Sequence, residues 1–257
     1  MTEDLHQALN RLEAWMRQYM KSWYNEAEDI QQAIRMKEEH TMRVLGYARE
    51  LSEHLGLAGD DVIRAEIMGL LHDVGRFRQF TIYRTFNDAQ SEDHAALGLK
   101  TIADEGLISS LPEKDQEIIR FAIWNHNKKV IEPAPDKISL MYAKILRDAD
   151  KLDIYHVLEP FIAPSDGTGI SPDFVRKFTA GEQCDYTMIR TMDDRKLVRL
   201  MWVYDINYSW TMKRVLERGY IDKIVRCLPQ GDAEIDKGVQ RLREYVKEKC
   251  NSEDKAE

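Results

Sequence analysis

The sequence predicts an all-α protein, and three observations support this. Apolar residues recur every three or four positions along the chain, which is the period of a helix with one buried face. No stretch alternates apolar and polar residues over the length of a strand. Glycine (13) and proline (7) are scarce in the 257 residues, at about two thirds of ordinary usage. We therefore expect long helices with few interruptions.

The first helices are predicted from apolar spacing and from residues that begin or end a helix. Leu5 to Met20 forms an amphipathic stripe, and a second helix runs from about Ile30 to Leu55. Gly56 suits the position just after that helix, because glycine tolerates a left-handed backbone. The pair Asp60-Asp61 caps a third helix, which Gly75 interrupts.

The rest of the chain is predicted in the same way. The aromatic and polar stretch 76–90 is expected to be a loop, with Ser91 capping a helix that reaches Ala103. Further helices are expected at about 112–125 and 138–158, and about three more follow a proline- and glycine-rich loop at 160–172. We expect two domains, a helical domain at 1–165 and a C-terminal helical extension at 166–257 that packs on it.

Composition narrows the function classes. Lys and Arg number 37 against 45 Asp and Glu, a formal net charge of −8, whereas a protein that binds duplex nucleic acid is expected to be basic. The chain shows no secretory signal at its start and no apolar run near the roughly 20 residues that span a bilayer. Its three cysteines are widely spaced. These features predict a cytoplasmic protein with reduced thiols and no membrane partner.

Several histidines and aspartates fall on or beside apolar helix faces. His40 shares a face with Val44, and His126 follows Ala122 by one turn. A buried imidazole or carboxylate without a partner is costly, so something must satisfy each of them. They are either hydrogen-bonded core residues in separate places or ligands of one shared metal cluster, as in bundles that point ligands inward from several helices.

The order of these residues resembles the HD-domain superfamily of metal-dependent phosphohydrolases. The matching strings are HTMRV, GLLHDVGR, DHAALG, WNHNK and LRDADKLD, and they cover about residues 35–160. The ligand candidates they carry are His40, His72, Asp73, His94, His126 and Asp150. With two histidines between the His-Asp pair and the final aspartate, the pattern is similar to the dinuclear subset. The resemblance therefore implies an HD-domain helical bundle.

The resemblance also implies a ligand arrangement. His40, His72, Asp73 and Asp150 would hold one metal, and His94 and His126 would hold a second, with Asp73 bridging the two. The mixed nitrogen and oxygen donors argue against a site for magnesium alone. We expect two divalent transition-metal ions, with Fe or Mn preferred over Zn, Co or Ni.

Catalytic and substrate-binding residues are expected near the His-Asp pair. Asp73 and Arg76 are the catalytic candidates. Arg76 would contact phosphate, where the family places Lys or Arg, and Lys128 and Lys129 are further substrate-binding candidates. Asp93 and Asp153 are candidates to orient ligand imidazoles, although capping of a helix explains Asp93 equally well. The expected loop also offers four residues that would suit an anionic substrate with a ring: Arg78, Tyr83, Arg84 and Phe86.

The leading hypothesis is hydrolysis of a phosphoester or phosphoanhydride bond by a metal-bridged hydroxide. The substrate would be a nucleotide or another phosphorylated small molecule. The alternative is a mixed-valent di-iron oxygenase, since some relatives with this ligand set resemble such enzymes. A non-enzymatic nucleotide sensor is a third hypothesis, disfavoured because the chain keeps all six candidate ligands. A homodimer through the outer helices is an ordinary expectation.

Overall fold

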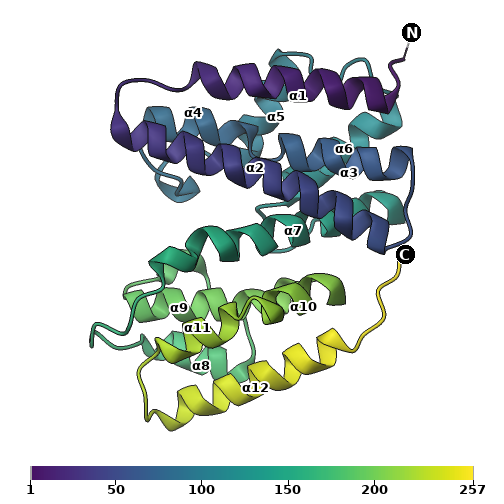
Figure 1. The fold of residues 1–257 in the computed structure, drawn as a ribbon. Helices are drawn as coiled ribbons and strands as arrows, with labels where there is room; N and C mark the ends of the chain where they lie inside the picture. The colour runs from purple at the N-terminus through teal and green to yellow at the C-terminus, as the bar shows by residue number, and fades with distance from the viewer. Residues whose placement is uncertain (1, 257) are drawn as a thin grey trace. The chain divides into compact units, whose positions relative to one another are not determined.

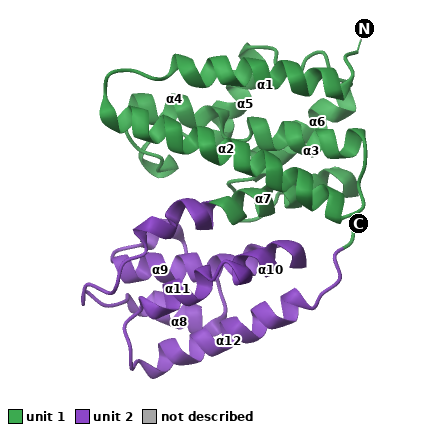
Figure 2. Cartoon of the chain, in the orientation of Figure 1, with its two compact units in different colours: residues 1–153, 255–257 green, residues 154–254 purple. Residues whose placement is uncertain are grey.

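The computed structural model describes residues 2–256, and within that range it contains helices and turns but no strand. The all-α prediction is therefore confirmed. The chain divides into two compact units, one formed mainly by the residues up to 153 and one by residues 154–254 (Figure 2). The expected domain division near residue 165 stays a prediction. No helix in the described range combines the length and the apolar character needed to cross a membrane.

The first unit is a bundle with α3 at its centre (Figure 1). Its elements are α1 (Leu5–Ser22), α2 (Glu28–His54), α3 (Asp60–Leu71), α4 (Val74–Tyr83), η1 (Asp88–Gln90), α5 (His94–Asp104), α6 (Glu113–Asn125) and most of α7 (Lys137–Leu158). Helix α3 packs against α1, α2 and α6, and from Val62 to Leu71 nearly every residue is buried. The His-Asp pair follows α3 directly and is therefore placed inside the bundle.

Helix ends in this unit follow local chemistry. The Asp4 side chain accepts hydrogen bonds from the backbone amides of His6 and Gln7 and begins α1. Helix α2 ends as predicted before Gly56, which has a φ of 81°, a value that glycine adopts without steric cost. The stripe predicted for α1 is buried from Leu5 to Met20.

The segment after the His-Asp pair differs from its prediction. Residues 74–83 form α4 instead of a loop, and Gly75 lies inside this helix instead of interrupting one. The reason is close packing: a Cβ atom on Gly75 would lie 2.4 Å from the backbone oxygen of His94 and 2.6 Å from the backbone nitrogen of Gly98. Asp93, and not Ser91, caps α5. Glycine here allows α4 and α5 to touch, which brings His94 to the His-Asp pair.

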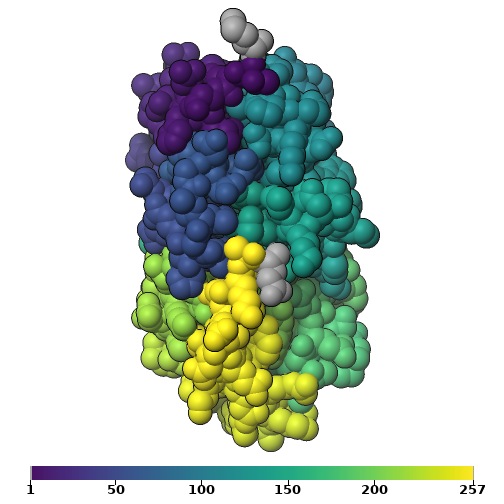
Figure 3. All heavy atoms as spheres, turned by 90° about the vertical axis from the view of Figure 1, so that its right-hand side faces the viewer, coloured from purple at the N-terminus to yellow at the C-terminus, as the bar shows by residue number. Residues whose placement is uncertain are grey.

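The second unit is also helical. Its elements are η2 (Glu159–Phe161), α8 (Pro172–Ala180), η3 (Tyr186–Met188), α9 (Met192–Met201), η4 (Trp202–Asp205), α10 (Ser209–Glu217), α11 (Tyr220–Arg226) and α12 (Ala233–Cys250). Helix α12 packs against α8 and α10, and its outer side chains lie on the surface, as the yellow atoms of Figure 3 show. The aromatic residues Tyr208 and Trp210 are buried at 6% and 5% exposure, so they belong to the core.

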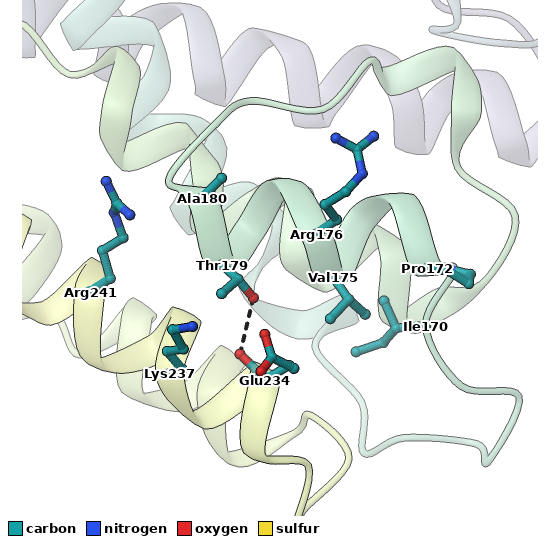
Figure 4. A pocket seen from close by; sticks show the side chains of 9 residues that line it. All are labelled: Ile170, Pro172, Val175, Arg176, Thr179, Ala180, Glu234, Lys237 and Arg241. Atoms are coloured by element: carbon teal, nitrogen blue, oxygen red, sulfur yellow. Dashed lines mark hydrogen bonds between the residues drawn. The ribbon is translucent and has the colours of Figure 1, made fainter.

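A shallow pocket of about 670 Å³ lies between α8 and α12 (Figure 4). Val175 and Thr179 line it from α8, and Lys237 and Arg241 line it from α12. The Thr179 hydroxyl donates a hydrogen bond of 3.1 Å to the backbone oxygen of Glu234 and so joins the two helices (Figure 4). None of the residues predicted to bind metal or substrate lines this pocket.

The close approach of α4 and α5 gives a direct test. We expect Gly75→Ala to destabilise the protein by about 1–3 kcal/mol, because the new methyl group meets backbone atoms that cannot move independently. Gly46→Ala is the matched control: Gly46 is also helical, but a Cβ there meets nothing within 4 Å. It should leave stability unchanged or raise it by up to about 1 kcal/mol. Urea unfolding of both variants and the wild type measures these changes. Equal unfolding midpoints for Gly75→Ala and Gly46→Ala would contradict the packing role of Gly75.

Candidate metal centre

Four buried histidines converge in the first unit from four different helices. His40 lies in α2, His72 follows α3, His94 begins α5 and His126 follows α6. Each is at most 6% exposed. The Nε2 atoms of His40 and His72 are 3.2 Å apart, and those of His94 and His126 are 2.8 Å apart. The bundle therefore brings together imidazoles that are far apart in sequence.

The other ring nitrogen of each histidine faces a hydrogen-bond acceptor. The Nδ1 contacts are His40 to Asp153 Oδ2 at 2.7 Å, His72 to Gly69 O at 2.8 Å, His94 to Asp88 Oδ2 at 2.6 Å and His126 to Ile123 O at 2.6 Å. A backbone oxygen can only accept, so Nδ1 carries the proton in His72 and His126. Carboxylates impose the same arrangement on the other two. When all four rings are neutral, as metal ligands must be, their Nε2 lone pairs face the centre.

Asp73 lies between the two pairs of imidazoles and presents one oxygen to each. Its Oδ2 is 3.3 Å from His40 Nε2 and 3.5 Å from His72 Nε2. Its Oδ1 is 3.5 Å from His94 Nε2 and 3.6 Å from His126 Nε2. Asp150 joins the first pair, with Oδ1 3.2 Å from His40 Nε2. The carboxylate of Asp73 is thus positioned to bridge two cations.

The donor atoms form two groups, each compact enough for one ion. The ligand atoms of His40, His72 and Asp150 lie within 4.8 Å of one another, and so do those of Asp73, His94 and His126. Two imidazole nitrogens, each about 2.0–2.1 Å from one ion, are separated by roughly 3 Å when they occupy adjacent positions. The observed separations of 3.2 and 2.8 Å are close to that value. The residues present therefore fit divalent metals of the transition series.

The electrostatics of the centre favour added positive charge. The pKa values of Asp73 and Asp150 lie well below the usual range: burial opposes this, but Lys37 and the surrounding imidazoles together outweigh it for Asp73, and His40 and His72 together outweigh it for Asp150. Both carboxyl groups are therefore ionised. The contacts of His40 with carboxylates in turn raise its pKa to about 9, against the effects of burial and Lys37, so this ring carries a second proton until a cation replaces it. Burial and the charge of Arg76 lower the pKa of His94 to about 4, which keeps this ring neutral and able to act as a ligand.

Two charged residues near the centre were missed in the sequence. The Lys37 ammonium donates a 2.6 Å hydrogen bond to Asp73 Oδ2, and Asp88 joins His94 Nδ1 to the Arg76 side chain. Lys37 lies one helical turn before His40, a spacing that was available as a signal. Asp88 offered none, because its position depends on the turn between α4 and α5.

The predicted orienting residues separate into two kinds. Asp153 contacts His40 Nδ1 and also accepts a 2.6 Å hydrogen bond from Arg43 Nε, so it fixes the ring of His40. Asp93 instead caps α5 through the amides of Ala95 and Ala96. Capping is therefore the role its contacts describe.

The predicted substrate residues lie at different distances from the centre. Arg76 has its Nε 3.5 Å from Asp73 Oδ1, while its Nη1 donates to Gln79, to the backbone oxygen of Phe86 and to Asp88. Its buried Nε has no hydrogen-bond partner among the described residues. Lys128 pairs with Asp93 at 2.5 Å and lies over the Trp124 ring.

The remaining substrate candidates lie outside this group. Lys129 is exposed. The Tyr83 hydroxyl bonds Glu92, and Arg84 pairs with Asp29 at the surface. Phe86 differs from these, because its ring lies beneath both Lys37 and Arg76, at 5.4 and 5.7 Å from the ring centre. The structure thus brings Phe86, and not the other ring-bearing candidate, to the charged groups around Asp73.

Residues 38–155 match the family model of the HD domain. The match begins just before His40 and ends just after Asp153, so it spans all six candidate ligands. This segment of the chain therefore resembles the HD domain, a family whose members are mostly metal-dependent hydrolases. Neither the curated proteins nor the solved structures contain a significant match to the chain.

The contact between Asp153 and His40 predicts a measurable effect on metal binding. We expect Asp153→Asn to weaken metal affinity by about 10–100-fold, because the amide no longer holds the His40 ring and its proton in place. Asp115→Asn is the matched control, since Asp115 is also a mostly buried, arginine-paired aspartate of the first unit but does not contact the histidines. Competition with a metal chelator measures both affinities. Equal affinities in the two variants would show that Asp153 does not support the site.

Proposed function

We propose that this protein is a metal-dependent phosphohydrolase with a dinuclear centre. The reaction class is cleavage of a phosphoester or phosphoanhydride bond in a phosphorylated small molecule, with nucleotides as the first class to test. The observation that carries the proposal is the bridging position of Asp73, whose two oxygens face two separate pairs of imidazoles. A carboxylate in this position suits two cations held a few ångströms apart.

Each half of the centre would hold one ion. His40, His72, Asp73 and Asp150 would bind the first, and Asp73, His94 and His126 would bind the second. When bound, such ions supply Lewis acidity toward a phosphoryl oxygen and an acidified water as nucleophile. Four imidazoles with two carboxylates suit iron or manganese, and zinc, cobalt and nickel are the alternatives.

Arg76 is the residue best placed to hold the phosphoryl group. Three acceptors fix its Nη1, so the planar guanidinium has little freedom to move. Its Nε lacks a protein acceptor and lies near Asp73, where an oxygen of the substrate would be held. A fixed donor of this kind stabilises charge that develops on phosphoryl oxygens in the transition state, without reorganisation.

Lys37 supplies a second positively charged group, which lies beside the other carboxylate oxygen of Asp73. Its ammonium bonds Oδ2, whereas Arg76 lies on the side of Oδ1. Once metals neutralise Asp73, the ammonium is available to an anionic substrate. The Phe86 ring under both cations provides an apolar surface for a ring of the substrate. Lys128 is paired with Asp93 and Lys129 is exposed, so both would contact a part of the substrate other than the phosphoryl group.

A di-iron oxygenase is the competing function, because the same six donors suit iron. Two assays distinguish the proposals. Phosphate release from a panel of nucleotides and phosphoesters, with protein reconstituted with Mn²⁺, Fe²⁺ or Co²⁺, supports hydrolysis. Oxygen consumption by the iron-loaded protein, with no phosphate release under any metal, supports the oxygenase instead. Location in the cytoplasm and assembly as a homodimer stay proposals that these assays do not address.

The role of Arg76 yields a graded prediction. We expect Arg76→Gln to lower kcat/KM for phosphate release by about 10²–10³-fold, and Arg76→Lys to restore only part of it, because an ammonium lacks the planar pair of donors. Arg120→Gln is the control, since Arg120 pairs with Glu113 on the exposed face of α6. Steady-state kinetics on the best substrate of the panel measures the effect. Full activity in Arg76→Gln would remove this residue from the mechanism.

Lys37 yields a second prediction. We expect Lys37→Met to raise KM by about tenfold or more while changing kcat less, because the residue binds the anionic substrate without facing the phosphoryl group that Arg76 holds. Methionine retains most of the volume of the lysine stem, so the packing over Phe86 is preserved. An unchanged KM would show that Lys37 serves only to balance the charge of Asp73.

A further inference from the structure

Helix α9 carries two arginines one helical turn apart, Arg195 and Arg199, whose side chains form no ion pair with a carboxylate among residues 2–256. Arg199 is only 6% exposed, although it is among the residue types that are rarely buried without a partner. Arg195 is half-buried, and its Nε is a fully buried nitrogen with no hydrogen-bond partner among the described residues. Both residues lie beyond the HD-domain match.

The carboxylates of α9 are already committed to other groups. Asp193 pairs with Lys196 at 2.7 Å and accepts a hydrogen bond from Ser165. Asp194 completes the capping box of α9 and accepts hydrogen bonds from the Ser171 hydroxyl and from backbone amides. Within residues 2–256 the guanidinium of Arg199 has neither a hydrogen bond nor an ion pair with a carboxylate. The helix therefore presents a local surplus of positive charge.

This surplus is unfavourable for the protein alone. Two like charges four residues apart on a helix repel each other, and burial of an unpaired charge is more costly still. Burial, together with the nearby Arg195, lowers the pKa of Arg199 below its ordinary value, despite an opposing effect of Tyr186. Charged groups that destabilise the protein without a ligand are typical of ligand sites. Arg195 and Arg199 are such groups, because the carboxylates of their own helix are bound to other residues.

We propose that Arg195 and Arg199 form a binding site for a phosphate-bearing ligand on α9. Two guanidinium groups offer planar pairs of donors that match phosphate oxygens. Their combined charge of +2 matches a phosphate group, which carries about −1.5 to −2 near neutral pH, better than a single carboxylate. Tyr186, in the short helix η3 that precedes α9, is near enough to Arg199 to affect its pKa.

Calorimetric titration of the full-length protein with pyrophosphate and with inorganic phosphate tests this site. We expect Arg195→Gln and Arg199→Met each to weaken one class of binding sites by tenfold or more. Arg243→Met, on the exposed face of α12 and paired with Asp222, is the control and should bind as the wild type does. Arg76→Gln should retain the α9 site, so failure of the proposed catalytic function and failure of this site give different results.

Thermal unfolding supplies a readout that a structural arginine would not give. Without ligand, we expect Arg199→Met to unfold at a higher temperature than the wild type, because an unpaired buried charge is replaced by an apolar chain of similar length. Pyrophosphate should stabilise the wild type and the Arg243→Met variant but stabilise Arg199→Met less. Undiminished pyrophosphate binding in both Arg195→Gln and Arg199→Met would overturn the proposal. If Arg199→Met does not fold, pyrophosphate binding by Arg195→Gln alone tests the proposal.

Discussion

The arrangement of the first unit depends on four imidazole rings whose Nε2 atoms point at one buried carboxylate, that of Asp73. Each histidine has a hydrogen-bond acceptor at Nδ1, and this contact orients the ring so that its Nε2 points toward Asp73. When all four rings are neutral, Nε2 lone pairs face one another at 2.8 and 3.2 Å and cannot satisfy each other. A cation between them resolves both the repulsion and the burial of ionised carboxylates. The helices packed around α3 hold the four histidines in the positions that this cation site requires.

Much of the centre could be predicted from sequence, because helical spacing fixes which residues share an apolar face. His40, His72, His126 and Asp150 were placed inward in this way, and the resemblance to the HD domain grouped them with Asp73 and His94. The sequence does not predict the helix at 74–83, since a glycine near its start is more typical of a helix break. Glycine in that position instead permits contact between two helices, which only the three-dimensional packing reveals.

The supporting charges were harder to predict for a different reason. Asp153 follows Asp150 by three residues and could be proposed from the helix alone. Lys37 and Asp88 act through contacts with residues 36 and 6 positions away, across turns whose geometry the sequence does not specify. Lys128 and Lys129 were proposed from proximity in sequence to His126, but Lys128 turns toward Asp93. Side-chain direction in a loop depends on the acceptors nearby, and these come from other elements.

The number of metal ions bound per chain tests the central claim most directly. Elemental analysis of freshly purified protein should find two transition-metal ions per chain, and the variant His94→Ala should retain about one, because only the half of the centre formed with His126 is lost. Asp73→Ala should lose both, since its carboxylate serves each half. A wild-type protein with no bound metal under any reconstitution, or an Asp73→Ala variant that keeps both ions, would contradict the account.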